Sequence, residues 1–142
     1  MKTIDGHEVK KGRIYYLVLC PACSIHGLRA EHILGIKVVK CRCTKVGAYP
    51  AMKTIYWGTR VKRKKEIRIP YATVKSTDPL QTTERTFYYN EASKYLFKDL
   101  AKAQNYCLEK IAFIQDCFQE VCDQATKEIL RENKKCSSKS QQ

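Results

Sequence analysis

The sequence predicts an α+β protein, in which a small antiparallel β domain is followed by a long amphipathic helix or helical hairpin. All six glycines and all four prolines of the 142-residue chain lie at or before Pro79, among short runs rich in β-branched and aromatic residues. After Asn90 the apolar residues instead recur at intervals of three and four, the spacing of one helix face. We therefore expect a β domain over residues 1–89, a helical region over 90–135 and a disordered tail over 136–142.

Five strands are expected in the β domain. The runs rich in strand-forming residues are 13–19, 32–40, 53–57, 66–71 and 86–89. Glycine and proline mark the expected turns between strands, most clearly at residues 47–50 and at Asp78 and Pro79.

The helical region carries one apolar stripe. Asn90 is the expected N-cap, with Glu91 in the first turn, where a negative charge suits the helix dipole. One straight helix over 90–135 would be about 65 Å long, more than the diameter of a domain of this size. We therefore expect one of two outcomes. Either the helix projects from the β domain and binds a partner, or it breaks near Gln104 and Asn105 into two antiparallel helices. The stripe consists of Leu96, Leu100, Ala103, Cys107, Ile111, Ile114, Phe118, Val121, Ala125 and Ile129.

The composition narrows the class of protein. Hydrophobic residues make up 44% and charged residues 29% of the chain, which is typical of a folded protein and not of a disordered one. Because no apolar run reaches 18 residues, we expect neither a signal peptide nor a membrane span. The expected location is the cytoplasm, where reduced cysteines favour metal ligation over disulfides.

Positive charge is concentrated in the β domain. The net charge is +13, and residues 1–90 hold 18 Lys and Arg against six Asp and Glu, whereas residues 91–135 hold eight of each sign. A field of this kind attracts phosphates or acidic surfaces. The expected partner is therefore a nucleic acid or an acidic protein surface.

Four cysteines form two close pairs near the start of the chain. Cys20 and Cys23 have the CPxC spacing that lets a backbone turn direct two thiolates at one tetrahedral metal ion, and Cys41 and Cys43 follow 17 residues later. This arrangement predicts a structural zinc site with the ligands Cys20, Cys23, Cys41 and Cys43. The two cysteine pairs can meet at one metal ion only if residues 24–40 fold into a hairpin of their own.

The second pair also fits another interpretation. Its CxC spacing matches the alternation of a strand, and a direct hairpin between residues 13–19 and 32–40 would hold Cys20 and Cys41 at opposite ends. In that case the cysteines are small buried core residues. His26 and His32 lie between the pairs as alternative ligands.

The main candidate contact surface is the basic run at residues 60–68, which follows Tyr56 and Trp57. In a β hairpin its cationic side chains would lie along a phosphate backbone, while Trp57 would stack on exposed bases. The alternative is a solvated turn, with Trp57 inside the core. The candidate nucleic-acid-binding residues are Trp57, Arg60, Lys62, Arg63, Lys64, Lys65 and Arg68.

Catalysis has little support in the sequence. The chain has no GxSxG, HExxH or phosphate-loop motif, and it lacks the HxE and PCxxC signature of zinc deaminases. We therefore do not expect an enzyme.

Two partial resemblances follow from these residues. The cysteine pairs resemble those of a zinc ribbon, while Asp5 to Val9 with Gly12 and Tyr15 resembles the start of small SH3-like barrels in phage and bacterial proteins. The sequence thus favours a small, non-enzymatic, zinc-binding accessory protein that binds nucleic acid through a basic β-hairpin loop. The alternative is a protein-interaction module, an inhibitor or adaptor encoded by a phage or mobile element, acting through its helix and basic surface. The helix would also serve in homodimerisation.

Overall fold

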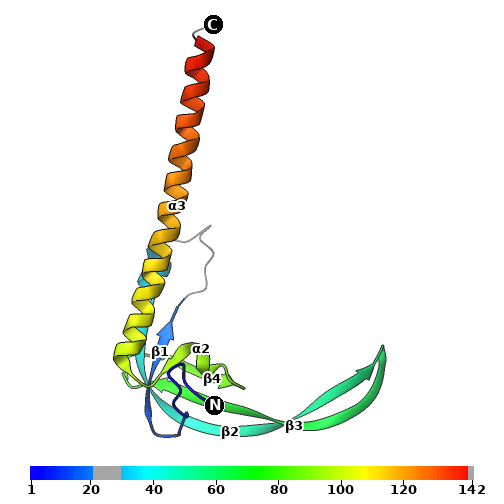
Figure 1. The fold of residues 1–142 in the computed structure, drawn as a ribbon. Helices are drawn as coiled ribbons and strands as arrows, with labels where there is room; N and C mark the ends of the chain where they lie inside the picture. Colours follow the sequence, from blue (N-terminus) through cyan, green and yellow to red (C-terminus); the bar gives the residue numbers. More distant parts are fainter. Residues whose placement is uncertain (21–29, 141–142) are drawn as a thin grey trace.

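The computed structural model of the protein describes residues 1–20 and 30–140, with side chains as far as residue 135. The fold is α+β: an open, five-stranded antiparallel sheet is followed by one long helix (Figure 1). The strand order is β4-β3-β2-β1-β5. In chain order the elements are β1 (Ile14–Leu19), α1 (Ala30–Leu34), β2 (Lys37–Trp57), β3 (Arg60–Ser76), β4 (Glu84–Tyr88), α2 (Ala92–Tyr95), β5 (Leu96–Phe97) and α3 (Leu100–Ser140).

The predicted SH3-like barrel is wrong, because the sheet has two free edges. β4 and β5 lie at opposite ends of the strand order, and a barrel requires the edges to pair. The zinc-ribbon topology is not formed either. It needed a hairpin within residues 24–40, but the described part of that segment forms α1 and the start of β2, and β2 pairs with β1.

The predicted strands are found with two changes. Residues 32–40 are divided between α1 and β2, and β2 continues through residues 47–50, where we expected a turn. Gly47 lies opposite Tyr71, and a Cβ atom there would come within 3.1 Å of the Tyr71 hydroxyl. Glycine at position 47 therefore leaves room for the Tyr71 ring to pack against the backbone of β2. Pro50 pairs with Arg68 where the sheet has only two strands, so each strand has a free edge that tolerates proline.

The core has two parts, one on each face of the sheet. The first core cluster joins β1, β2, β3 and β4 to the N-terminal segment and α2, and its largest members are Tyr15, Phe87, Leu17 and Leu96. The second core cluster lies between β1, β5 and α3 and contains Val18, Phe97, Ala103 and Cys107. Alternating side chains of β1 thus fill both clusters, since Leu17 belongs to the first and Val18 to the second.

A single helix, α3, follows the sheet, so the hairpin alternative with a break near Gln104 and Asn105 is wrong. α3 begins at Leu100 rather than at Asn90, because Leu96 and Phe97 pair with β1 as an edge strand. Asp99 accepts a hydrogen bond from Ala101 N at 2.9 Å and is the cap. The 41 residues of α3 give a length of about 60 Å and include residues 136–140, which we expected in the tail. In the described part of the chain, no helix is long and apolar enough to span a membrane.

Asp5 connects the N-terminal segment to the start of α3. Its carboxylate accepts hydrogen bonds from Lys98 N at 3.0 Å and Asp99 N at 3.0 Å, and from the Thr3 hydroxyl at 2.6 Å. Burial raises the pKa of Asp5, but these hydrogen bonds together outweigh it and hold the pKa below the usual value of an aspartate. The ionised form of Asp5 therefore stabilises the fold.

We expect Asp5→Asn to lower the free energy of unfolding by about 1 kcal/mol at neutral pH, the range of a charged hydrogen bond near solvent. Because the folded pKa of Asp5 is lowered, its contribution is complete above the unfolded pKa of about 3.9 and is lost as the pH falls through the folded pKa. Urea titrations at pH 7 and at decreasing pH should therefore show a difference between wild type and variant that is largest at pH 7 and shrinks as the pH falls below about 3.9. Asp116→Asn, at an exposed position on α3, is the control, and an equal effect there would contradict this role of Asp5.

Candidate nucleic-acid interface

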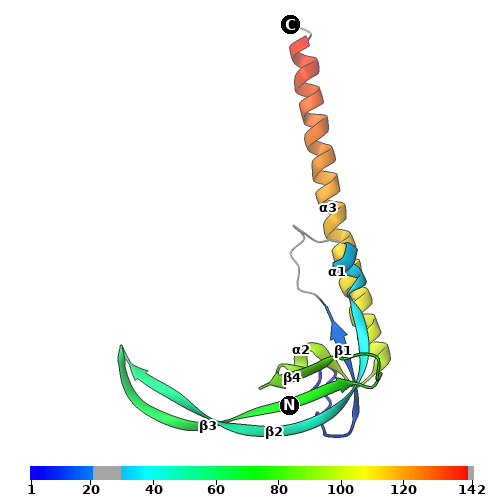
Figure 2. The same cartoon turned by 180° about the vertical axis from the view of Figure 1, so that it is seen from behind.

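The most prominent surface of the molecule is a two-stranded ribbon made by the distal halves of β2 and β3. β1 pairs with β2 only over residues 37–42, and β4 pairs with β3 only over residues 71–75. Residues 48–70 therefore pair only with each other, and residues 45–47 pair with residues 71–73 at the base of this ribbon. We call residues 45–70 the arm. The arm contains about 40 Å of strand and projects as a curved ribbon away from α3 (Figures 1 and 2).

The sequence determines where the arm turns and where it bends. Gly58 has a φ of +60°, and the two-residue connection between Trp57 and Arg60 places glycine first, which is the requirement of a type II′ hairpin turn. A register shift follows at Ile55 and Tyr56, where Lys62 is the extra residue of a bulge. Bulges increase strand twist locally, so the tip is rotated relative to the rest of the arm.

The arm carries a large share of the positive charge of the protein. Its 26 residues include eight Lys and Arg and a single acidic residue, Glu66. All nine of these charged residues are exposed. Because charges of one sign on a narrow ribbon face solvent on both sides, they create a strongly positive field at this end of the molecule. The basic residues are Lys45, Lys53, Arg60, Lys62, Arg63, Lys64, Lys65 and Arg68.

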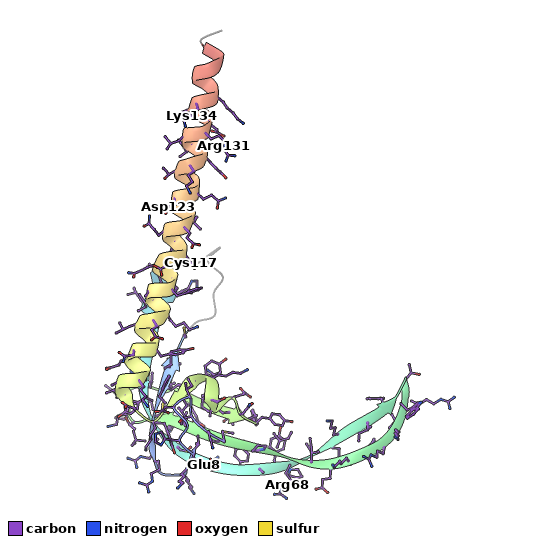
Figure 3. All side chains as sticks on the ribbon, viewed as in Figure 1. Glu8, Arg68, Cys117, Asp123, Arg131 and Lys134 are labelled. Carbon is purple, nitrogen blue, oxygen red and sulfur yellow. The ribbon has the colours of Figure 1, made fainter. Side chains whose placement is uncertain are left out.

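The basic residues lie on both faces of the arm. Lys65 pairs with Lys53, and Arg63 pairs with Ile55, so these side chains share one face. Lys64 and Arg68 lie on the other face, opposite Thr54 and Pro50. Figure 3 shows Arg68 partway along the arm, far from α3. A nucleic-acid backbone on either side of the ribbon would meet cations.

The tip of the arm is aromatic. Trp57 is 73% exposed and Tyr56 is 62% exposed, so the alternative that Trp57 fills the core is wrong. The ammonium group of Lys62 lies 5.1 Å from the centre of the Trp57 ring, a cation–π distance. The outer face of this ring is available for stacking on a base.

A second aromatic group lies at the base of the arm and was missed by the sequence analysis. Tyr49 contacts the Tyr71 ring at 6.4 Å and the Tyr88 ring edge-on at 6.0 Å. By strand alternation these tyrosines share their face with Ile67 and Ile69, which are half-buried. Interpreting residues 47–50 as a turn concealed this face. The alternation of Ile67, Ile69 and Tyr71 was the signal that could have revealed it.

The structure brings the predicted nucleic-acid-binding residues together on one element. All seven lie in the arm: Trp57, Arg60, Lys62, Arg63, Lys64 and Lys65 lie toward its tip, and Arg68 lies nearer its base. The predicted form of this surface was nevertheless inaccurate, because residues 60–68 form strand β3 and not a loop. The hairpin turn itself contains only Gly58 and Thr59.

The described cysteines of the predicted zinc site are not together. Cys41 lies opposite Tyr15, and Cys20 follows β1 five residues beyond Tyr15, a separation of about 16 Å along the strand. Cys41 and Cys43 belong to the first core cluster, whereas Cys20 packs against the second, on the other face of the sheet. Cys23 and His26 lie outside the described residues. Within residues 1–20 and 30–140, no group of three or more His, Cys, Asp or Glu side chains is placed to hold a metal ion.

Cys41 and Cys43 are core residues in this structure. Both are buried, and the exposed Arg42 between them follows the alternation of β2. Burial raises the pKa of the Cys41 thiol to about 11 and also raises the pKa of Cys43. Both thiols are therefore protonated at neutral pH, as expected of cysteines that pack as small apolar side chains. In the part of the chain that the structure describes, Cys41 and Cys43 thus pack in the core, and the zinc site, which also needs Cys23, stays a prediction.

Paired substitutions of Cys41 test this role. We expect Cys41→Ala to lower the free energy of unfolding by about 1–2 kcal/mol because the sulfur no longer packs in the core, and Cys41→Ser to lower it further because a hydroxyl is buried in an apolar cluster. Urea denaturation gives the order of the two variants, and elemental analysis gives the metal content. Stoichiometric zinc in the wild type that both variants lose would contradict the packing role and support the predicted metal site.

Comparisons of the chain with protein-family models, with curated proteins and with solved structures found no match. The inference of function therefore depends on the residues of the arm and on their geometry.

Proposed function

We propose that this protein binds nucleic acid non-enzymatically through its arm, making contact mainly with the phosphate backbone. The observation that carries the proposal is the arm itself: an exposed two-stranded ribbon with eight basic residues and one acidic residue. A two-stranded β ribbon has the dimensions of the major groove of B-DNA, and its lysines and arginines are the side chains that contact phosphates most often.

The arrangement of the arm favours backbone contact over sequence reading. Reading bases in a groove requires donors and acceptors in fixed positions, whereas the arm offers mainly cationic side chains on flexible stems. Lys62 and Trp57 at the tip add a cation and an aromatic ring side by side, a combination that binds any base by stacking. We therefore expect affinity with little sequence preference.

The direct test is binding of the full-length protein to labelled duplex and single-stranded oligonucleotides at several salt concentrations. Support for the proposal consists of binding that weakens steeply as salt rises and that requires the basic residues of the arm. Absence of binding at 50 mM salt, or binding that persists when the arm is neutralised, would contradict the proposal.

A further inference from the structure

The distal half of α3 presents an apolar stripe that no part of the described chain covers. α3 contacts β1, β2 and β5 near its start, where Ala103 and Cys107 are buried, and beyond the level of α1 its C-terminal part rises alone (Figures 1 and 2). Phe118 is 36% exposed, Val121 49% and Ile129 60%. Isolated helices gain too little from their own hydrogen bonds to be stable in water, so an apolar stripe on such a helix indicates a partner.

The pattern of this stripe is that of a helix-pairing seam. Cys107, Ile111, Ile114, Phe118, Val121 and Ala125 follow one another at intervals of 4, 3, 4, 3 and 4 residues, which is the heptad spacing of a coiled coil. Ile129 continues the same face one turn later. A stripe of this kind packs against an identical stripe.

The charges of the helix also favour pairing with an identical helix. Between Ile114 and Ala125, the residues that flank the stripe are the uncharged Gln115, Cys117, Cys122 and Gln124. Glu109, Asp116 and Asp123 are spaced seven apart, at the heptad position farthest from the stripe, so they lie on the opposite side of the helix. The next heptad positions after Ala125 are Glu128 and Glu132, so the seven-residue repeat of the seam ends at Ala125, and Ile129 alone extends its apolar face. Figure 3 shows Cys117, Asp123, Arg131 and Lys134 along this rising part of α3. Two copies of the stripe can thus meet without bringing like charges together.

The position of the sheet on α3 determines whether two α3 helices can pair parallel or antiparallel. The sheet already covers the stripe at Ala103 and Cys107, so a parallel pair would place two sheets in the same space on the seam. It would also bring together the two parts of the chain that carry most of the positive charge. In an antiparallel pair the free segments overlap, while the two sheets lie at opposite ends.

We propose that a second copy of this chain covers the stripe, so that two α3 helices pair antiparallel over residues 111–129. An overlap of this length is about 28 Å, and a strip about 12 Å wide on each helix buries roughly 700 Å² in total. This area lies below that of most stable complexes, so the dimer is reversible, with a Kd no tighter than about micromolar. The proposal does not depend on nucleic-acid binding and is tested without nucleic acid.

Sedimentation velocity of the full-length protein from about 1 to 200 µM tests the interface. We expect a monomer–dimer equilibrium, with Val121→Asn raising the Kd about tenfold or more because amide groups are buried in the seam. Leu130→Asn is the matched control, since Leu130 is 56% exposed on the far side of α3, and it should leave the Kd unchanged. A monomer at every concentration, or an equal effect of both variants, would overturn the proposal.

Small-angle X-ray scattering of the dimer tests the orientation. With the centre of pairing near residue 120, the two sheets attach to the helices about 50 Å apart, which gives a second maximum in the distribution of interatomic distances. A parallel dimer would place the two sheets side by side and give one maximum. That result would overturn the antiparallel arrangement.

Discussion

Replacing Lys62, Arg63, Lys64 and Lys65 with glutamine should reduce the affinity of the protein for duplex DNA by about 10²–10³-fold at 0.1 M salt. Each cation that binds a phosphate releases a condensed counterion, so the slope of log K against log salt changes by about 0.9 for each such cation removed. Removing four cations therefore flattens the slope by about 3.6. Fluorescence anisotropy at 50–300 mM salt measures both the affinity and the slope.

This prediction has a control of equal total charge. Lys10, Lys11, Lys37 and Lys40 are exposed and lie outside the arm, so their replacement with glutamine removes the same net charge from the sheet end of the molecule. We expect this control to weaken binding only a few-fold through the long-range field and to leave the salt slope unchanged. Equal effects of the two variants would show that overall charge, and not the arm, binds the nucleic acid.

Trp57 allows the tip to be examined separately. It is the single tryptophan of the chain, and its exposed position means that a stacked base should quench its fluorescence. Quenching during the same titrations would place bases at the tip. Binding without quenching would restrict contact to the cationic strands.

The sequence was sufficient to predict the division of the chain, because local signals are strong there. The loss of glycine and proline after Pro79 and the three-and-four spacing from Leu96 onward predicted a sheet followed by a helix, and the basic run at residues 60–68 identified the arm. These features depend on neighbouring residues and on periodicity, which a sequence shows directly.

The errors arose where tertiary pairing overrides local signals. Leu96 fits the helical stripe, yet it lies in β5 because the edge of β1 was open to pairing. Residues 47–50 contain turn-forming glycine and proline, yet β2 continues because Tyr71 packs over Gly47. The spacing of the cysteine pairs likewise does not show that the pairing of β1 with β2 places Cys20 and Cys41 apart along the strand. Local sequence does not specify which strands pair.

The arm adds much surface and little buried core, so the stability of the protein should depend on the base of the sheet. Phe87 lies there, fully buried in the first core cluster, with its ring stacked on Tyr95 at 6.3 Å. The guanidinium of Arg85 lies 4.1 Å from the centre of the Tyr95 ring and 5.2 Å from that of Phe87. This stack joins β4 to α2 and so fixes one edge of the sheet.

We expect Phe87→Ala to lower the free energy of unfolding by about 3–5 kcal/mol, through reduced burial and the cavity left behind. Since small domains are stable by only about 5–15 kcal/mol, the variant should be largely unfolded at moderate urea concentrations. Far-UV circular dichroism is the suitable measurement, because the exposed Trp57 does not report on the core. Phe113→Ala makes the same chemical change at a side chain that is 64% exposed, and it should cost less than about 0.5 kcal/mol. Similar losses of stability in the two variants would mean that Phe87 is not part of the core that holds the sheet together and supports the arm.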